Sequence, residues 1–253
     1  MNKWKDIWNQ RHTEGLINLE KLIKLDGFDS KTGKISSEDW LNYTEFISKK
    51  INITGSDSIY ETGCGSGAFL YPFYEKGHKV GGIDYSENLI NTAKSVMPGG
   101  NFTCSEAADL DTDTKYDIVI SNSAFFYFPS YDYGERVLKK MLCKARKAVA
   151  ILDVADINFK DNIEKAKIDS LGEEEYKKKY DGLQHLYYDR HWFLNPDLYY
   201  FSIEIFNQEI NHYGYNDFRF NVIYKKYGFQ CMAENGKILS GSDVYGRSIE
   251  ERT

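Results

Sequence analysis

The chain has 253 residues, a hydrophobic share of 42% and a formal net charge of −6 from 32 basic and 38 acidic residues. Because these charges are mixed along the chain, no basic stripe forms of the kind that binds nucleic acid. No apolar run reaches the roughly 20 residues that span a bilayer, and the opening stretch MNKWKDIWNQRH lacks the apolar core of a signal peptide. We therefore expect a cytoplasmic protein with neither a nucleic-acid nor a membrane partner.

The first elements in chain order are helical. Residues 1–25 and about 36–50 carry apolar side chains at helical spacing, and serines precede the second pattern as caps. We expect residues 1–50 to form a helical cap against the core of a single domain that spans 1–253.

Short apolar runs then alternate with helical patterns between residues 55 and 156. The predicted strands are 58–62, 79–83, 101–104, 117–121 and 147–153, and the predicted helices are about 67–76, 86–95 and 131–145. Alternation of this kind predicts a parallel sheet with helices on both faces.

The alternation stops after the fifth strand. Residues 157–200 begin with a charged, weakly helical stretch, which indicates a helical insertion on the acceptor side. Two alternating strands joined by NHYGYN predict an antiparallel hairpin at 201–227, and 228–253 form a polar tail. The fold class is therefore α/β, in three layers, with a seven-stranded and mostly parallel sheet.

The stretch SIYETGCGSGAFL contains a glycine loop between a strand and a helix, a place where backbone can approach a ligand closely. Gly63, Gly65 and Ala68 also satisfy the dinucleotide pattern GxGxxA, so a nucleotide-dependent oxidoreductase remains open. Two carboxylates favour a ligand with an ammonium group and a ribose over one with a phosphate at the loop. Glu61 ends the first strand, where it would repel a phosphate and attract an ammonium group, and Asp84 ends the second, where it can accept hydrogen bonds from ribose hydroxyls.

These residues resemble the class I, Rossmann-like S-adenosylmethionine-dependent methyltransferases of the small-molecule-modifying type. ETGCGSG is similar to their first motif, and the resemblance continues through GIDYSENLINTAK and SEAADLDTDTKYDIVISNSAFFYF, although Glu106 replaces the usual aspartate. The resemblance implies S-adenosylmethionine as cofactor and S-adenosylhomocysteine as product. It also implies the cofactor-binding residues, which are Glu61, Gly63, Gly65, Gly67, Asp84, Tyr85, Glu106, Ala107, Asn122 and Ser123, with Trp8 and Arg11 as gates from the N-terminal segment.

The acceptor side is less defined. Transfer to a hydroxyl benefits from a general base, and the candidates are Asp153, after the fifth strand, and His185 and His191, after the insertion. Tyr127, Tyr187 and Tyr188 are candidates for lining the acceptor pocket, with packing as the competing interpretation. Four scattered cysteines without a CxxC pair indicate neither a metal site nor disulfides.

The lead hypothesis is O-methylation of a small polar molecule, such as a sugar or sugar nucleotide for a surface glycan, by a monomer or homodimer, with His185 or His191 as the base. The alternatives are N-methylation of a small amine, an NAD-dependent oxidoreductase, and a methyltransferase-like domain that binds partners without catalysis.

Overall fold

The computed structural model describes residues 3–12, 15–28, 34–194 and 201–226, together with the backbone of two short strands, β8 (Cys231–Met232) and β9 (Ile238–Leu239). These two strands pair antiparallel. The rest of the expected tail, 228–253, lies outside the described residues.

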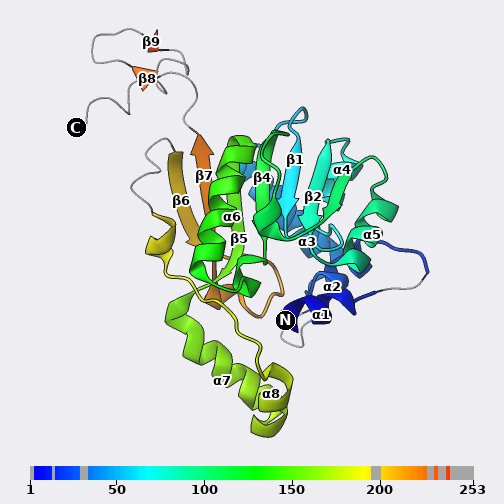
Figure 1. The fold of residues 1–253 in the computed structure, drawn as a ribbon, viewed down its shortest axis with the longest axis vertical. Helices are drawn as coiled ribbons and strands as arrows, with labels where there is room; N and C mark the ends of the chain where they lie inside the picture. The colour runs from blue at the N-terminus through cyan, green and yellow to red at the C-terminus, as the bar shows by residue number, and fades with distance from the viewer. Residues whose placement is uncertain are drawn as a thin grey trace.

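A seven-stranded sheet forms the centre of the molecule (Figure 1). Its strands are β1 (Ile59–Thr62), β2 (Val80–Asp84), β3 (Asn101–Cys104), β4 (Tyr116–Asn122), β5 (Ala145–Ala155), β6 (Phe201–Asn207) and β7 (Arg219–Lys226). They lie in the order β3-β2-β1-β4-β5-β7-β6, and only β7 among them runs against its neighbours. The predicted fold class is therefore confirmed.

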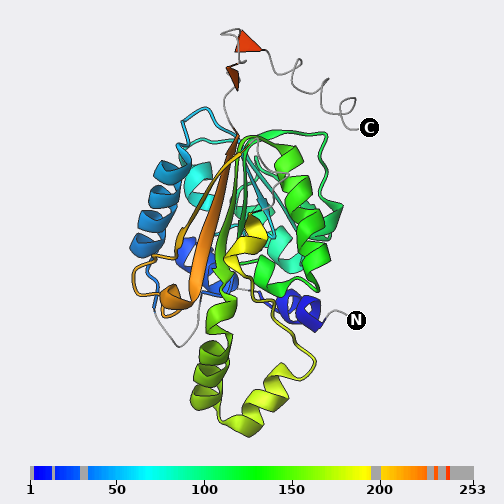
Figure 2. The same cartoon turned by 90° about the vertical axis from the view of Figure 1, so that its left-hand side faces the viewer.

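Helices cover both faces of the sheet, which gives the three layers seen edge-on in Figure 2. On one face lie α3 (Ser37–Ile51), α4 (Tyr71–Glu75) and α5 (Glu87–Val96), and on the other lies α6 (Tyr131–Lys144). Successive side chains of a strand point to opposite faces. Accordingly, Ile118 and Ile120 join the first core and Val119 joins the second.

The helical region expected at 1–25 is not continuous. It consists of two short helices, α1 (Lys3–Asn9) and α2 (Leu19–Leu25). Gly15 has a φ of +71°, which a helix cannot contain, and the Asn18 side chain accepts a hydrogen bond from the Lys21 amide to start α2. The amphipathic pattern was correct for α2 but did not reveal this break.

The insertion after β5 is helical, as expected. It contains α7 (Lys160–Leu171) and α8 (Glu173–Tyr180), which project from the end of the sheet where α1 and α2 also lie (Figures 1 and 2). The Trp4 indole donates to the Gln184 carbonyl at 2.9 Å and so joins α1 to the segment that follows α8. Short 3₁₀ helices occur at Ala107–Asp109, Phe125–Tyr127, Ile157–Phe159, Arg190–Phe193 and Asn216–Phe218. Of the helices in the described ranges, none combines the length and the apolar character that crossing a bilayer requires.

Candidate functional site

A cleft opens at the carboxyl ends of β1, β2 and β4, where open α/β sheets bind ligands. It encloses about 790 Å³ of space that contains no protein atoms, open solvent at its mouth included. The residues that line it are Trp8, Asp26, Phe28, Trp40, Glu61, Gly63, Cys64, Gly65, Phe69, Ile83, Asp84, Tyr85, Leu89, Glu106, Ala107, Asn122, Ser123, Ala124, Tyr127, Phe128, Pro129 and Tyr133.

The floor of the cleft is the glycine loop between β1 and α4. Gly63, Gly65 and Gly67 all have positive φ angles, of +71°, +52° and +85°. Space is also restricted, because a Cβ on Gly65 would collide with the carboxylate of Asp26. The loop thus needs glycine both for its backbone conformation and for close packing.

Asp84 ties the end of β2 to this loop. One carboxylate oxygen accepts a hydrogen bond from the Gly65 amide at 3.0 Å, and the other accepts one from the Ser86 amide at 2.8 Å. Burial raises the pKa of Asp84 to about 6. A carboxylate offers about four acceptor positions, so Asp84 retains capacity for ligand hydroxyls in the cleft it lines.

Glu61, at the end of β1, is the most deeply buried carboxyl group of the cleft and is 2% exposed. Its Oε2 atom has no hydrogen-bond partner among the described residues. Burial, followed by the charges of Asp26 and Asp84, raises its pKa well above the ordinary value. A cation in the cleft would supply the missing partner and favour the ionised carboxylate.

Asp26 is a functional candidate that the sequence did not indicate. It follows α2, and its two oxygens accept hydrogen bonds from the Ser66 amide at 2.6 Å and the Ala68 amide at 2.9 Å. Burial raises its pKa to about 7. The pair Asp26–Gly27 has the pattern of an ordinary helix end, and only the tertiary contact reveals that this carboxylate holds the glycine loop.

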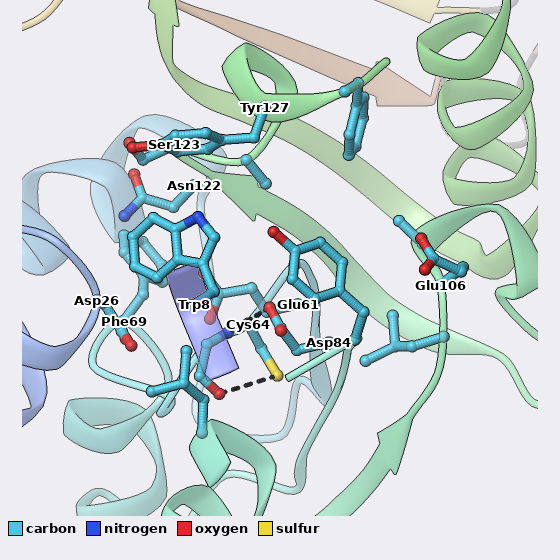
Figure 3. A pocket seen from close by; sticks show the side chains of 18 of the residues that line it. Trp8, Asp26, Glu61, Cys64, Phe69, Asp84, Glu106, Asn122, Ser123 and Tyr127 are labelled. Atoms are coloured by element: carbon cyan, nitrogen blue, oxygen red, sulfur yellow. Dashed lines mark hydrogen bonds between the residues drawn. The ribbon is translucent and has the colours of Figure 1, made fainter. Parts of the chain in front are cut away.

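The far end of the cleft is formed by the segments after β2 and β3, where Tyr85, Glu106 and Ala107 lie. Glu106 is separated in Figure 3 from Asn122 and Ser123, which lie at the opposite end. The Glu106 carboxylate accepts a hydrogen bond from the Tyr133 hydroxyl at 3.3 Å. Tyr133 was not a sequence candidate.

The two expected gates differ in their placement. Trp8 lines the cleft and lies across its front in Figure 3. Arg11 instead donates to the backbone carbonyls of Lys24 and Leu25, at 2.6 and 3.2 Å, and lies against the Trp8 ring. Arg11 therefore contacts the Trp8 ring and joins α1 to the end of α2.

Ser123 and the buried Asp153 form a hydrogen-bonded pair near the carboxyl ends of β4 and β5. The Ser123 hydroxyl donates to Asp153 Oδ2 at 2.7 Å, and the Tyr213 hydroxyl donates to the same oxygen at 3.0 Å. Gln208 Nε2 donates to Asp153 Oδ1 at 3.2 Å. Ser123 and Asp153 have φ angles of +56° and +57°, which are unfavourable for residues with a Cβ. Two strained backbones that aim one hydroxyl and one carboxylate at each other suggest a functional constraint.

The other acceptor-side candidates lie apart from the cleft lining. His185 stacks on Phe126 with ring centres 3.9 Å apart, and burial lowers its pKa to about 2. The His191 side chain is 88% exposed and lies 2.8 Å from Asp189. Tyr127 is the exception, because it lines the cofactor cleft.

Tyr187 and Tyr188 are packed in the hydrophobic core, and the Tyr188 hydroxyl donates to the Phe125 carbonyl at 3.2 Å. Neither is among the described residues that line the cleft. Within the described ranges, no group of three or more potential metal ligands occurs.

The charges of the cleft decide between the two nucleotide ligands that the glycine loop allows. A pyrophosphate would face Asp26, Glu61 and Asp84 and would be repelled by their ionised forms. S-adenosylmethionine fits these residues, since it carries sulfonium and ammonium charges and ribose hydroxyls. Glu61, with its unpartnered buried oxygen, is the strongest indication of a cationic ligand.

Comparisons with known proteins agree. Residues 59–150 match the model of the methyltransferase domain family. An uncharacterized methyltransferase of Schizosaccharomyces pombe is 30% identical over 90 residues, which cover 33% of this chain and 34% of that protein. A putative methyltransferase of invertebrate iridescent virus 6 is 25% identical over 166 residues, which cover 62% of this chain and 60% of that protein. The matched part of the chain therefore spans less than two thirds of either relative.

Solved structures show the same fold. Magnesium protoporphyrin IX methyltransferase from Synechocystis PCC 6803, with bound SAH, superposes with a TM-score of 0.56 at 16% identity over 89% of this chain and 94% of that one. A protein from Pyrococcus horikoshii OT3 superposes with a TM-score of 0.57 at 16% identity over 79% of this chain and 94% of that one. At such identities the likeness establishes the fold. Together, the comparisons show that residues 59–150 are similar to a methyltransferase domain family and that the chain shares the fold of these structures.

Proposed function

We propose that this protein transfers a methyl group from S-adenosylmethionine to a hydroxyl of a small polar acceptor, such as a sugar or sugar nucleotide. The observation that carries the proposal is the convergence of Asp26, Glu61 and Asp84 on one cleft, with a buried Glu61 oxygen that has no described partner. When bound, the cofactor supplies an electrophilic methyl group on a positively charged sulfur.

The chain's own residues would hold the cofactor along the cleft. Asp84 would accept hydrogen bonds from the ribose hydroxyls, and Glu61 would face the amino group. Glu106 and Ala107 would flank the adenine, while Asn122 and Ser123 would border the methionyl end. Methyl transfer then depends mainly on alignment of the acceptor with the reacting carbon.

A hydroxyl acceptor is favoured by the pair Ser123 and Asp153. Ser123 lines the cleft, and its hydroxyl already donates to the Asp153 carboxylate. An acceptor hydroxyl that donates to Ser123 Oγ could release its proton along this path to Asp153, whereas an amine that arrives deprotonated needs no such base.

The histidines are weaker candidates for the base. The low pKa of His185 makes its ring a poor proton acceptor near neutral pH, and His191 is exposed beside Asp189.

Calorimetry with S-adenosylhomocysteine and NAD, side by side, tests the cofactor assignment. We expect saturable binding of S-adenosylhomocysteine alone. Binding of NAD alone would overturn the assignment and support the oxidoreductase alternative.

A screen of hydroxyl-bearing and amine-bearing metabolites for release of S-adenosylhomocysteine tests the acceptor. Release with amines only would refute O-methylation while leaving the cofactor assignment intact.

A further inference from the structure

A second group of charged side chains lies on the other side of the turn after β4. Its centre is Phe126, which is 4% exposed. The His185 ring stacks 3.9 Å from the centre of this ring, the Arg219 guanidinium lies 4.3 Å from it, and Lys167 Nζ lies 5.4 Å from it. We call Lys167 and Arg219, with the rings they contact, the cation cluster. The His185 ring, whose pKa burial lowers to about 2, is its uncharged neighbour.

Arg219 is the buried member of the cation cluster, at 6% exposure. Its Nε atom has no hydrogen-bond partner within the described ranges, and it lies 4.0 Å from Asp153 Oδ1. That carboxylate already accepts hydrogen bonds from Ser123, Tyr213 and Gln208. The guanidinium donates to the Asp153 carbonyl through Nη1 at 3.4 Å, whereas the Nε–H has no acceptor among the described residues. A buried N–H without an acceptor is costly, and a ligand that accepts from it would remove this cost.

Lys167 reaches the same ring from α7. Its ammonium group lies 5.0 Å from the Tyr180 ring centre, between the insertion and the sheet. Burial and the charge of Arg219 lower its pKa to about 8, while Glu164 acts in the opposite direction and Lys179 adds to the lowering. Two cations are therefore held near one ring, with the Asp153 carboxylate as the acidic neighbour of Arg219 and Glu164 as that of Lys167.

Position connects the cation cluster with the cofactor cleft. Arg219 lies beside Asp153, Asp153 accepts a hydrogen bond from Ser123, and Ser123 lines the cleft. Tyr127 also borders both regions, since it lines the cleft and its ring centre lies 5.0 Å from that of Phe126. A small molecule that contacts Arg219 with one end can therefore present its other end near Ser123.

We propose that the methyl acceptor carries an anionic group, a carboxylate or a phosphate, which binds between Lys167 and Arg219. The inference rests on the proposed methyl transfer and narrows its acceptor class to hydroxylated anions. Arg219 would supply a planar N–H donor and Lys167 a point charge, and both groups recognise carboxylate and phosphate oxygens. The surrounding rings would exclude water and strengthen these interactions.

The test is calorimetry on the full chain saturated with S-adenosylhomocysteine. Inorganic phosphate and glycerate are titrated in separate experiments, with glycerol as the uncharged control. We expect saturable binding of phosphate or glycerate and none of glycerol, and the stronger of the two anions identifies the charged group.

The diagnostic variant is Lys167→Met, and its matched control is Lys165→Met, an exposed lysine on the same helix. Loss of one charge-assisted hydrogen bond predicts anion binding weaker by about tenfold or more in Lys167→Met, with unchanged binding in Lys165→Met. A lysine that only fixes α7 through ring contacts would lower stability in Lys167→Met and leave anion affinity unaltered.

Absence of saturable binding of both anions to the wild type, or equal affinities in the wild type and Lys167→Met, would overturn the inference. The titration with S-adenosylhomocysteine separates this failure from failure of the proposed function. If that compound does not bind, the proposed function fails and the acceptor assignment fails with it, while the anion titrations on the ligand-free chain still decide whether Lys167 and Arg219 bind an anion.

Discussion

The cofactor cleft and the cation cluster are neighbours that are built in different ways. In the cleft, carboxylates at strand ends contact backbone amides of one loop, as Asp84 contacts Gly65 and Ser86. In the cation cluster, side chains from distant segments contact one another around Phe126. The first arrangement follows from strand order, whereas the second exists only once the insertion has folded onto the sheet.

The two regions also carry opposite charge. Acidic groups surround the cleft, where a cationic cofactor is expected, and Lys167 and Arg219 lie in the neighbouring region. Ser123 and Asp153 stand at the boundary. This separation suggests that each ligand is selected by charge before the reacting groups are aligned at the boundary.

The largest effect is expected in the cleft, from Asp84→Ala. The substitution removes the acceptor of two backbone amides and of the ribose hydroxyls, and charge-assisted hydrogen bonds contribute about 1.5–3 kcal/mol each. We expect S-adenosylhomocysteine to bind at least about a hundredfold more weakly by calorimetry. Asp113→Ala, at an exposed loop carboxylate, is the control. Unaltered binding of S-adenosylhomocysteine to Asp84→Ala would show that the acidic cleft is not the cofactor-binding site.

Much of the cleft could be predicted because its residues occupy positions that secondary structure defines. The glycine loop and the tips of β1 and β2 follow from local alternation, which placed Glu61 and Asp84 correctly at strand ends. Asp26 could not be predicted in the same way, because its role arises from a contact with a loop 40 residues away. The break between α1 and α2 was missed because amphipathic spacing does not report where a helix stops.

The placement of the histidine and tyrosine candidates for the acceptor site could not be predicted, for a related reason. His185 and His191 are similar in sequence context, yet one is stacked on Phe126 and the other is exposed. Tyr127 lines the cleft, while Tyr188 is fully buried in the core. Which ring faces a ligand depends on how the insertion packs, and no periodic pattern encodes that packing.

The boundary between the two regions is tested by Asp153→Asn, measured with an acceptor found in the release screen. Loss of a general base typically lowers kcat by about a hundredfold or more. S-adenosylhomocysteine affinity should stay unchanged, because Asp153 lies outside the cleft lining of the described residues. Ser123→Ala should reproduce the loss in kcat. Lower stability with an unchanged kcat of the folded protein would instead show that Asp153 has a structural role only.

A smaller effect is expected from Gly65→Ala, which tests how tightly Asp26 holds the loop. The left-handed backbone costs an alanine about 1–2 kcal/mol, and the new Cβ would also displace the Asp26 carboxylate. Gly77→Ala is a matched control, because Gly77 also has positive φ, at +87°, but no described atom lies within 4 Å of the added Cβ. Chemical denaturation should show a larger loss of stability for Gly65→Ala. Equal losses would mean that the Asp26 contact contributes nothing beyond backbone strain.

The raised pKa values of the cleft carboxylates predict opposite effects of pH on the stability of the ligand-free protein and on its affinity for the cofactor. The pKa of Asp26 is raised to about 7 and that of Asp84 to about 6, so the folded chain holds more protons than the unfolded chain between about pH 4 and 7. Stability of the ligand-free protein should therefore fall as pH rises through this window.

Affinity for S-adenosylmethionine should change in the opposite direction, since its positive charges favour the ionised carboxylates. We expect roughly a tenfold gain between pH 5.5 and 7.5 by calorimetry. If affinity rises less with pH in Asp26→Asn than in the wild type, ionisation of Asp26 accounts for part of the rise. An affinity that does not depend on pH would contradict the role assigned to these carboxylates.

The smallest effect is expected from His191→Ala. Its side chain is 88% exposed and contacts Asp189, which is also on the surface. Ion pairs in such positions are screened by water and contribute little, so kcat, cofactor affinity and anion affinity should each stay within about twofold of the wild type. A large loss of kcat with normal cofactor and anion binding would show that a third region takes part in the reaction. The acidic cleft and the cation cluster would then not account for the whole reaction, because proton transfer would depend on a residue that belongs to neither region.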